Sequence, residues 1–114
     1  MAPAAATPDK QLAPLLTAGL DADALARITG RSLRTAERWA NGESAPRGEA
    51  RERLLATEAV IEALGAAFPG ADAGDWLRRP EIELDFETPI EVIAAGDAKR
   101  VLALLTAIGE GAYL

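Results

Sequence analysis

The sequence predicts an all-α protein, and its composition and helix-boundary residues both support this. Hydrophobic residues make up 49% of the 114 residues, only 4% are aromatic, and the apolar residues are mostly alanine and leucine. These two residues favour helices, whereas the β-branched and aromatic residues typical of strands are scarce. Capping residues and glycines also divide the chain into short segments with helical periodicity. We therefore expect about six to seven helices, arranged as two small lobes.

The first two helices are expected over 9–18 and 22–29. The first contains Pro14, which removes one backbone N–H and crowds the preceding turn. Asp21 can cap the second helix. Gly30 ends it, because glycine readily adopts the positive φ of the position that follows a helix.

A third helix is expected to begin after Ser32, whose hydroxyl can accept a hydrogen bond from the first turn. It runs to about Ala40 and ends at Asn41-Gly42. Helical spacing places four residues of this helix toward the core: Leu33, Ala36, Trp39 and Ala40.

A long helix is expected over 48–68 and ends at Pro69-Gly70. Its apolar face holds Leu54, Ile61, Leu64 and Phe68, with Leu55 beside them. Asp72 can cap a short helix that ends near Leu77. The segment 78–87 is predicted to be a loop, since its alternating apolar residues have no partner strand.

The C-terminal part carries the clearest boundary signals. Thr88, Pro89 and Glu91 form a capping-box pattern, with proline at the first helical position, where its missing N–H costs nothing. Gly96 ends that helix, and Asp97 is expected to cap the next one. This last helix, 98–108, presents five apolar residues: Val101, Leu102, Leu104, Leu105 and Ile108.

The residue inventory argues against an enzyme. The chain has no Cys and no His, which removes thiolate and imidazole chemistry, disulfides and the usual zinc or haem ligands. We see no carboxylate loop of the calcium-binding kind and no nucleophile–base pair. No signal sequence or membrane span is apparent. We therefore expect a cytoplasmic protein without cofactor, metal or membrane partner. Its first residues, 1–8, are expected to be flexible.

Charge is unevenly distributed along the chain, whose formal net charge is −6. Residues 27–53 hold seven Arg and four Glu, a balance of +3, whereas residues 71–114 hold nine acidic and four basic residues, a balance of −5. This asymmetry indicates two surfaces with different partners. The alternative is chance clustering on solvated helix faces.

The stretch "DADALARITGRSLRTAERWANG" carries a recognisable motif. Its features are Leu25-Ala26 in the first helix, Gly30 at the turn, Ser32 at the second cap, and Trp39 followed by Asn41-Gly42. It resembles the Xre/Cro-type helix-turn-helix of phage and bacterial repressors. The resemblance implies that the helix after Ser32 enters the DNA major groove, with its N-terminal side chains near base edges.

The candidate DNA contacts lie on and around this helix. Arg34, Thr35 and Arg38 are expected on the face opposite Leu33, Ala36 and Trp39. Trp39 is therefore interpreted as a packing anchor. Arginine can bond a guanine edge or hold a phosphate, and Asn41 either reads adenine or only caps the helix. The candidate set is Arg31, Ser32, Arg34, Thr35, Arg38, Asn41 and Arg47, with Arg27, Arg51 and Arg53 as further phosphate contacts.

The C-terminal segment "WLRRPEIELDFETPIEVIAAGDAKRVLALLTAIGEGAYL" carries a second motif. The residues that match it are Trp76-Leu77, Thr88-Pro89, Gly96-Asp97, Arg100-Val101-Leu102, Leu105 and Gly111-Ala112-Tyr113. They resemble the toxin-binding domain of the Xre/MbcA/ParS antitoxin family, whose order of domains this chain also follows. We accordingly expect a helix-turn-helix domain over 9–69 and a toxin-binding domain over 70–114.

The resemblance implies a function with two partners. The chain would bind and block a RES-domain toxin that degrades NAD⁺ or transfers ADP-ribose, and it would repress its own operon by binding operator DNA. One recognition helix neutralises few phosphates, so a homodimer and a larger toxin–antitoxin complex are expected. The alternative is a stand-alone transcription regulator whose C-terminal lobe dimerises or senses a ligand.

The candidate toxin contacts are Asp97, Lys99, Arg100, Gly111, Tyr113 and Leu114. We hypothesise that the terminal carboxylate approaches the cations that hold the NAD⁺ pyrophosphate, while Lys99 and Arg100 pair with acids at the rim. Alternatively, Tyr113 folds back on the core, and Arg100 pairs within the chain, for instance with Asp97.

The acidic run over 81–87 also has two interpretations. Its carboxylates could form a docking strip for a basic partner. The favoured alternative is a solvated loop that tucks three apolar residues into the core: Ile82, Leu84 and Phe86.

Overall fold

The computed structural model describes residues 10–111, so the expectations for residues 1–8, Tyr113 and Leu114 lie outside it. Within this range the chain is all-α, as predicted, and none of its helices is long and apolar enough to cross a membrane. The elements are α1 (Leu12–Thr17), α2 (Ala22–Thr29), α3 (Leu33–Ala40), α4 (Gly48–Ala67), α5 (Ala73–Leu77), the 3-10 helix η1 (Ile82–Leu84), α6 (Pro89–Ala94) and α7 (Ala98–Gly109).

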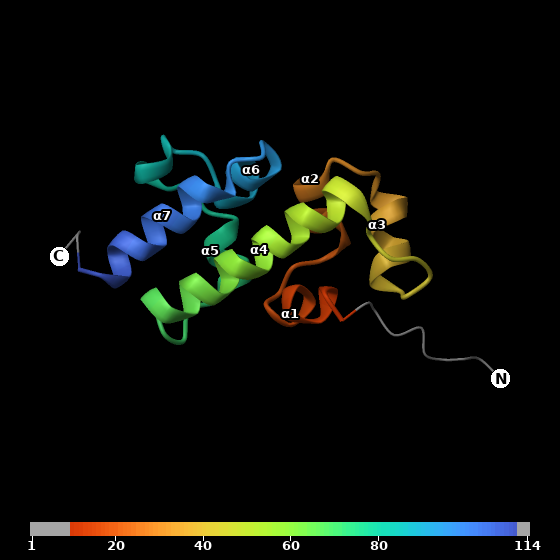
Figure 1. Cartoon of the computed structure of the whole chain (residues 1–114), viewed down its shortest axis with the longest axis horizontal. Coiled ribbons are helices and arrows are strands. Elements are labelled where there is room, and N and C mark those ends of the chain that lie inside the picture. The colour runs from red at the N-terminus through yellow and green to blue at the C-terminus, as the bar shows by residue number, and fades with distance from the viewer. Residues whose placement is uncertain (1–9, 112–114) are drawn as a thin grey trace.

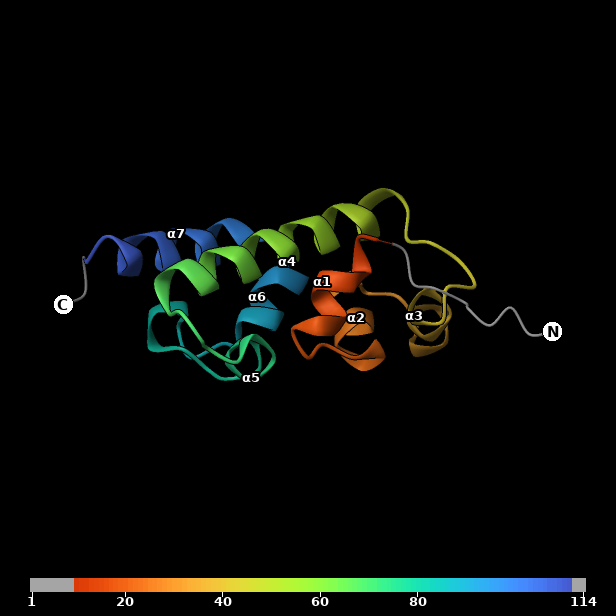
Figure 2. The same ribbon diagram turned by 90° about the horizontal axis from the view of Figure 1, so that it is seen from below.

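Helix α4 is the central element, because it contacts α1, α2, α5, α6 and α7. Helix α7 lies alongside α4, and α6 lies near α2 (Figures 1 and 2). Helix α3 lies at one end of the molecule, and the C-terminal end of α7 lies at the other (Figure 1). The N-terminal and C-terminal helices share one apolar core, which includes residues of α4. Helix α3 and the C-terminal end of α7 extend away from this core in opposite directions (Figure 1).

The turn between α2 and α3 forms as its sequence predicts. The Asp21 carboxylate accepts a hydrogen bond from Ala24 N at 2.9 Å, and Ser32 Oγ accepts one from Thr35 N at 3.1 Å. Gly30 ends α2 with a φ of 73°, a conformation that costs glycine little. Local hydrogen bonds therefore set both helix boundaries.

Three residues predicted on apolar helix faces are exposed, and one of them, Leu55 on α4, is 45% exposed. Leu33 is 47% exposed, because it is the first residue of α3 and no preceding helical turn lies over it. Phe68 is 40% exposed, because α4 ends at Ala67 and Phe68 leaves the helical face as the C-cap residue. Trp39 is buried at 4% exposure, as predicted.

The prediction for residues 81–87 is partly wrong. Residues Ile82–Leu84 form η1, and Glu81 pairs with Glu87 in an isolated antiparallel bridge. Leu84 is buried, as the favoured interpretation required, but Ile82 and Phe86 are 70% and 71% exposed. Simple alternation would direct Ile82, Leu84 and Phe86 to the same side. The tight turn of η1 instead leaves only Leu84 facing the core.

The capping box of α6 is confirmed. Thr88 Oγ1 accepts a hydrogen bond from Glu91 N at 3.1 Å, and Glu91 Oε1 accepts one from Thr88 N at 2.9 Å. Asp97 takes the N-cap position of α7, but its side chain makes no capping hydrogen bond. The turn after Gly96 holds its backbone at a ψ of 42°, away from the extended conformation that N-caps adopt.

The capping box predicts a pH-dependent contribution to stability. Hydrogen bonds from the Thr88 backbone and hydroxyl hold the pKa of Glu91 below its ordinary value of 4.5. Folding therefore favours the ionised carboxylate, and its contribution is present above the ordinary pKa and lost as pH falls through the lowered one. Glu91→Gln should be less stable than the parent chain at neutral pH, and this difference should shrink in acid.

Urea unfolding of both chains at neutral pH and at about pH 2.5 measures this difference. The subtraction removes the effects of the other carboxylates, which are common to both chains. A stability difference that stays constant or grows in acid would contradict the assigned role of the capping box.

Candidate functional site

The outer face of α3 presents the predicted arginines to solvent. Arg34 and Arg38 are exposed, whereas Ala36 and Trp39 on the opposite face are buried against the rest of the protein. This division follows the helical period, since residues three and four apart share a face. The buried pair fixes the helix, so its arginine face is a stable surface feature.

The structure brings three of the predicted DNA-contact residues together on one surface. Arg34, Arg38 and Asn41 line a shared hollow together with Glu37 and Glu43. Arg31, Ser32 and Arg47 are also exposed, and Thr35 is partly exposed. These residues span the N-terminal end of α3 and both of its flanking turns.

Several polar groups on this face already have partners within the chain. Ser32 Oγ bonds both the backbone N and the hydroxyl of Thr35, so its side chain acts as a helix cap. Arg38 Nε lies 4.0 Å from a Glu43 carboxylate oxygen, and both side chains are 55% exposed. Ion pairs this exposed contribute little, about 0–1 kcal/mol, so Arg38 can readily exchange Glu43 for a phosphate.

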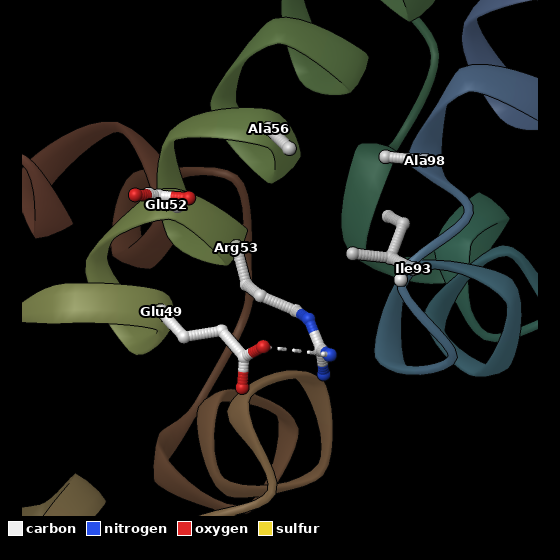
Figure 3. A pocket seen from close by; sticks show the side chains of 7 residues that line it. Glu49, Glu52, Arg53, Ala56, Ile93 and Ala98 are labelled. Atoms are coloured by element: carbon white, nitrogen blue, oxygen red, sulfur yellow. Dashed lines mark ion pairs between the residues drawn. The ribbon is translucent and has the colours of Figure 1, made fainter.

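Arg53 is not a phosphate contact, contrary to the sequence prediction. Its side chain is only 22% exposed, and it lies at a pocket of about 270 Å³ between α4 and the α6–α7 turn (Figure 3). Arg53 Nη1 donates to Ala94 O at 2.6 Å and to Ile28 O at 3.4 Å, with Glu49 beside it at 3.8 Å. One guanidinium thus links the C-terminal ends of α2 and α6.

Arg53→Ala should therefore lower the free energy of unfolding by about 1.5–3 kcal/mol, the typical effect of losing hydrogen bonds to a charged donor. The matched control is Arg51→Ala, an exposed arginine on the same helix, for which we expect a change within about 0.5 kcal/mol. Chemical denaturation of both variants measures the difference. Equal effects would contradict the linking role of Arg53.

The candidate residues in the C-terminal half do not gather at one point. Asp97 and Lys99 are exposed near the start of α7, whereas Gly111 follows the far end of that helix. Arg100 pairs within the chain, as the alternative interpretation held, but not with Asp97. Its guanidinium lies 3.3 Å from Asp85 and 3.7 Å from Glu87. Arg100 is therefore engaged with the 81–87 loop.

Sequence reasoning missed the exposure of Ile82 and Phe86 on this loop. In the sequence these apolar residues alternate with carboxylates. This alternation is equally consistent with buried and with exposed apolar side chains. In the part of the chain that the structure describes, no group of three acidic side chains could hold a metal ion.

Comparison with known proteins gives consistent matches. Residues 57–111 match the family described as the antitoxin Xre/MbcA/ParS C-terminal toxin-binding domain. The chain is 30% identical over 96 residues to the mycobacterial cidal antitoxin MbcA of Mycobacterium tuberculosis (strain H37Rv), covering 84% of this chain and 85% of that protein. The same protein of Mycobacterium bovis matches with equal identity and coverage.

A solved structure also resembles the fold. A chain in the crystal structure of the M. tuberculosis MbcT–MbcA toxin–antitoxin complex superposes with a TM-score of 0.76 at 28% identity. The match covers 91% of this chain and 94% of that chain. The likeness therefore extends over both the N-terminal and the C-terminal helices.

Proposed function

Because the chain belongs to the Xre/MbcA/ParS antitoxin family, we propose that it binds and blocks a RES-domain toxin and represses its own operon. The toxin either consumes NAD⁺ or transfers ADP-ribose, as the family resemblance implies. The relative matched in the solved structure is part of an MbcT–MbcA toxin–antitoxin complex, which supports a cognate toxin as the partner of this chain.

The observation that carries this proposal is the separation of two unlike surfaces. The exposed arginines of α3 lie at one end of the molecule, and the acidic 81–87 loop and the end of α7 lie at the other (Figure 1). A helix face with exposed arginines is suited to DNA phosphates and base edges. An acidic lobe would be repelled by DNA, so a basic protein partner is the better fit.

The DNA-binding arm of the proposal rests on α2 and α3 acting as a helix-turn-helix. Arg31, Arg34, Arg38 and Arg47 would contact bases and phosphates, while Ser32 and Thr35 hold the first turn of α3 in shape. We further propose that two copies bind one operator, because a single short helix makes too few phosphate contacts for specific affinity.

The toxin-binding arm assigns different roles to the C-terminal residues. Asp97 and Lys99 remain candidate contacts, since both are exposed. Arg100 is instead assigned to positioning the 81–87 loop, because Asp85 and Glu87 already occupy its guanidinium. Tyr113 and Leu114 remain proposed toxin contacts on the basis of the sequence alone.

Co-expression with the product of the adjacent gene tests the function. We expect the two proteins to co-purify, the toxicity of the partner to be lost, and the complex to bind DNA from the operon's own promoter. A chain that binds this DNA tightly but neither binds nor neutralises the adjacent product would instead be a stand-alone regulator.

A further inference from the structure

The 81–87 loop displays the two most exposed large apolar side chains among those of residues 10–111. Ile82 is 70% exposed and Phe86 is 71% exposed, whereas Leu33, the next in order, is 47% exposed. Exposed apolar groups that stand together, surrounded by polar residues, are typical of protein interaction sites. In the sequence of this loop, four carboxylate residues alternate with the apolar ones: Glu81, Glu83, Asp85 and Glu87.

The loop is held in one shape by its own backbone. Glu81 N donates to Glu87 O at 3.0 Å, and Phe86 N donates to Glu81 O at 2.9 Å. Leu84 anchors the loop from within, since it is 1% exposed. These contacts fix the positions of Ile82 and Phe86 before any partner arrives, which lowers the entropy cost of binding.

The backbone also adopts a strained conformation that turns Phe86 outward. Asp85 and Phe86 have φ values of 56° and 66°, and they are the non-glycine residues with positive φ in the described part of the chain. This conformation is uncommon for a bulky residue such as phenylalanine. Strain of this kind persists only where surrounding contacts impose it, and it concentrates at functional sites.

Arg100 on α7 adds two ion pairs to the backbone hydrogen bonds that hold this segment. Nη2 lies 3.3 Å from Asp85 Oδ2, and Nη1 lies 3.7 Å from Glu87 Oε1, so one guanidinium holds both sides of the strained segment. The Arg100 side chain is 37% exposed, less than either carboxylate it holds. Arg100 is therefore a positioning residue for the loop.

We propose that the 81–87 loop is a docking element for the toxin, with Ile82 and Phe86 entering an apolar hollow whose rim carries lysines or arginines. The inference rests on the proposed function and deepens it by assigning the surface. Residues 57–111 match a toxin-binding domain, and this range includes the loop. The loop carboxylates supply the charge complementarity with the rim.

Other occupants fit the loop less well. In a twofold contact between two copies of this chain, the same patch would face itself. Four carboxylates from each loop would then meet four from the other, with one arginine on each side to compensate. DNA is a polyanion and would be repelled by the same carboxylates. A basic-rimmed protein avoids both penalties.

The test compares toxin affinity between the parent chain and the double variant Ile82→Thr, Phe86→Asn. Threonine keeps the β-branched shape of isoleucine, and asparagine tolerates positive φ, so the loop geometry is preserved while its apolar surface is lost. We expect the Kd for the purified product of the adjacent gene, measured by isothermal titration calorimetry, to rise about 30-fold or more. The thermal unfolding midpoint should not change.

Leu55→Gln is the matched control, because Leu55 is a 45% exposed leucine on α4 outside the loop. We expect its Kd to equal that of the parent. An unchanged Kd in the double variant, or an equal loss in the control, overturns the docking role alone. No binding by the parent chain overturns the proposed function as well. A parent dimer that the double variant converts to monomer, with toxin affinity intact, would instead assign the loop to a second copy.

The role of Arg100 is tested by introducing Arg100→Gln into the parent chain and into the double variant Ile82→Thr, Phe86→Asn. If Arg100 acts by positioning the loop, this change weakens toxin binding in the parent chain but causes no further loss in the double variant. Equal losses in the two backgrounds would show that Arg100 contacts the toxin independently of the loop.

Discussion

Replacing Arg34 and Arg38 together with alanine is expected to weaken binding to operator DNA by about 2–6 kcal/mol for each bound copy, or roughly 30-fold to 10⁴-fold per copy. Both arginines lie on the exposed face of α3, and Arg38 is restrained only by an exposed ion pair with Glu43. An arginine on a guanine edge contributes about 1–3 kcal/mol of discrimination, and one on a phosphate contributes to affinity at low salt.

The control removes two positive charges from the other lobe. Arg79→Ala with Lys99→Ala gives the same change in net charge, and both residues are exposed. Fluorescence anisotropy with a labelled promoter duplex at fixed salt measures both variants. Equal losses in the two would show that only the overall charge matters, and the α3 interface would be rejected. The affinity of the arginine variant for the toxin should match that of the parent.

Trp39→Ala is expected to lower the free energy of unfolding by about 3–5 kcal/mol, as buried tryptophan deletions do. Trp39 is 4% exposed and anchors the inner face of α3 to the shared core. Small domains have only about 5–15 kcal/mol of total stability, so this loss removes a large part of it. DNA binding should fall as well, because the arginine face depends on how α3 is seated.

Leu33→Ala is the matched control on the same helix. Leu33 is 47% exposed, so its truncation should change the unfolding free energy by no more than about 0.5 kcal/mol. Guanidinium unfolding of both variants measures these free energies. It is monitored by far-ultraviolet circular dichroism, which reports helix content and does not require Trp39. Comparable losses would contradict the placement of Leu33 outside the core.

Several helix boundaries could be predicted, because they are encoded by residues close in the chain. Thr88 and Glu91 are three residues apart and satisfy each other's backbone N–H groups. Ser32 acts in the same way on Thr35 at the start of α3. The exposed face of α3 was likewise predictable. With 3.6 residues per turn, Arg34 and Arg38 point to one face of the helix and Trp39 points to another.

The C-terminal surface could not be predicted, because it depends on contacts between distant residues. Arg100 meets Asp85, fifteen residues earlier, only after α7 packs against η1. The direction of Phe86 depends on a positive φ that no residue preference for phenylalanine indicates. Arg53 was misassigned for the same reason, since its acceptors on α2 and α6 come together only in the folded chain.

We propose that opposite ends of this small helical protein hold two different macromolecules at once. Light scattering of a mixture of the chain, the product of the adjacent gene and a promoter duplex tests this most directly. We expect one species whose mass includes all three components. A mixture in which the toxin and the duplex displace each other from the chain would contradict it.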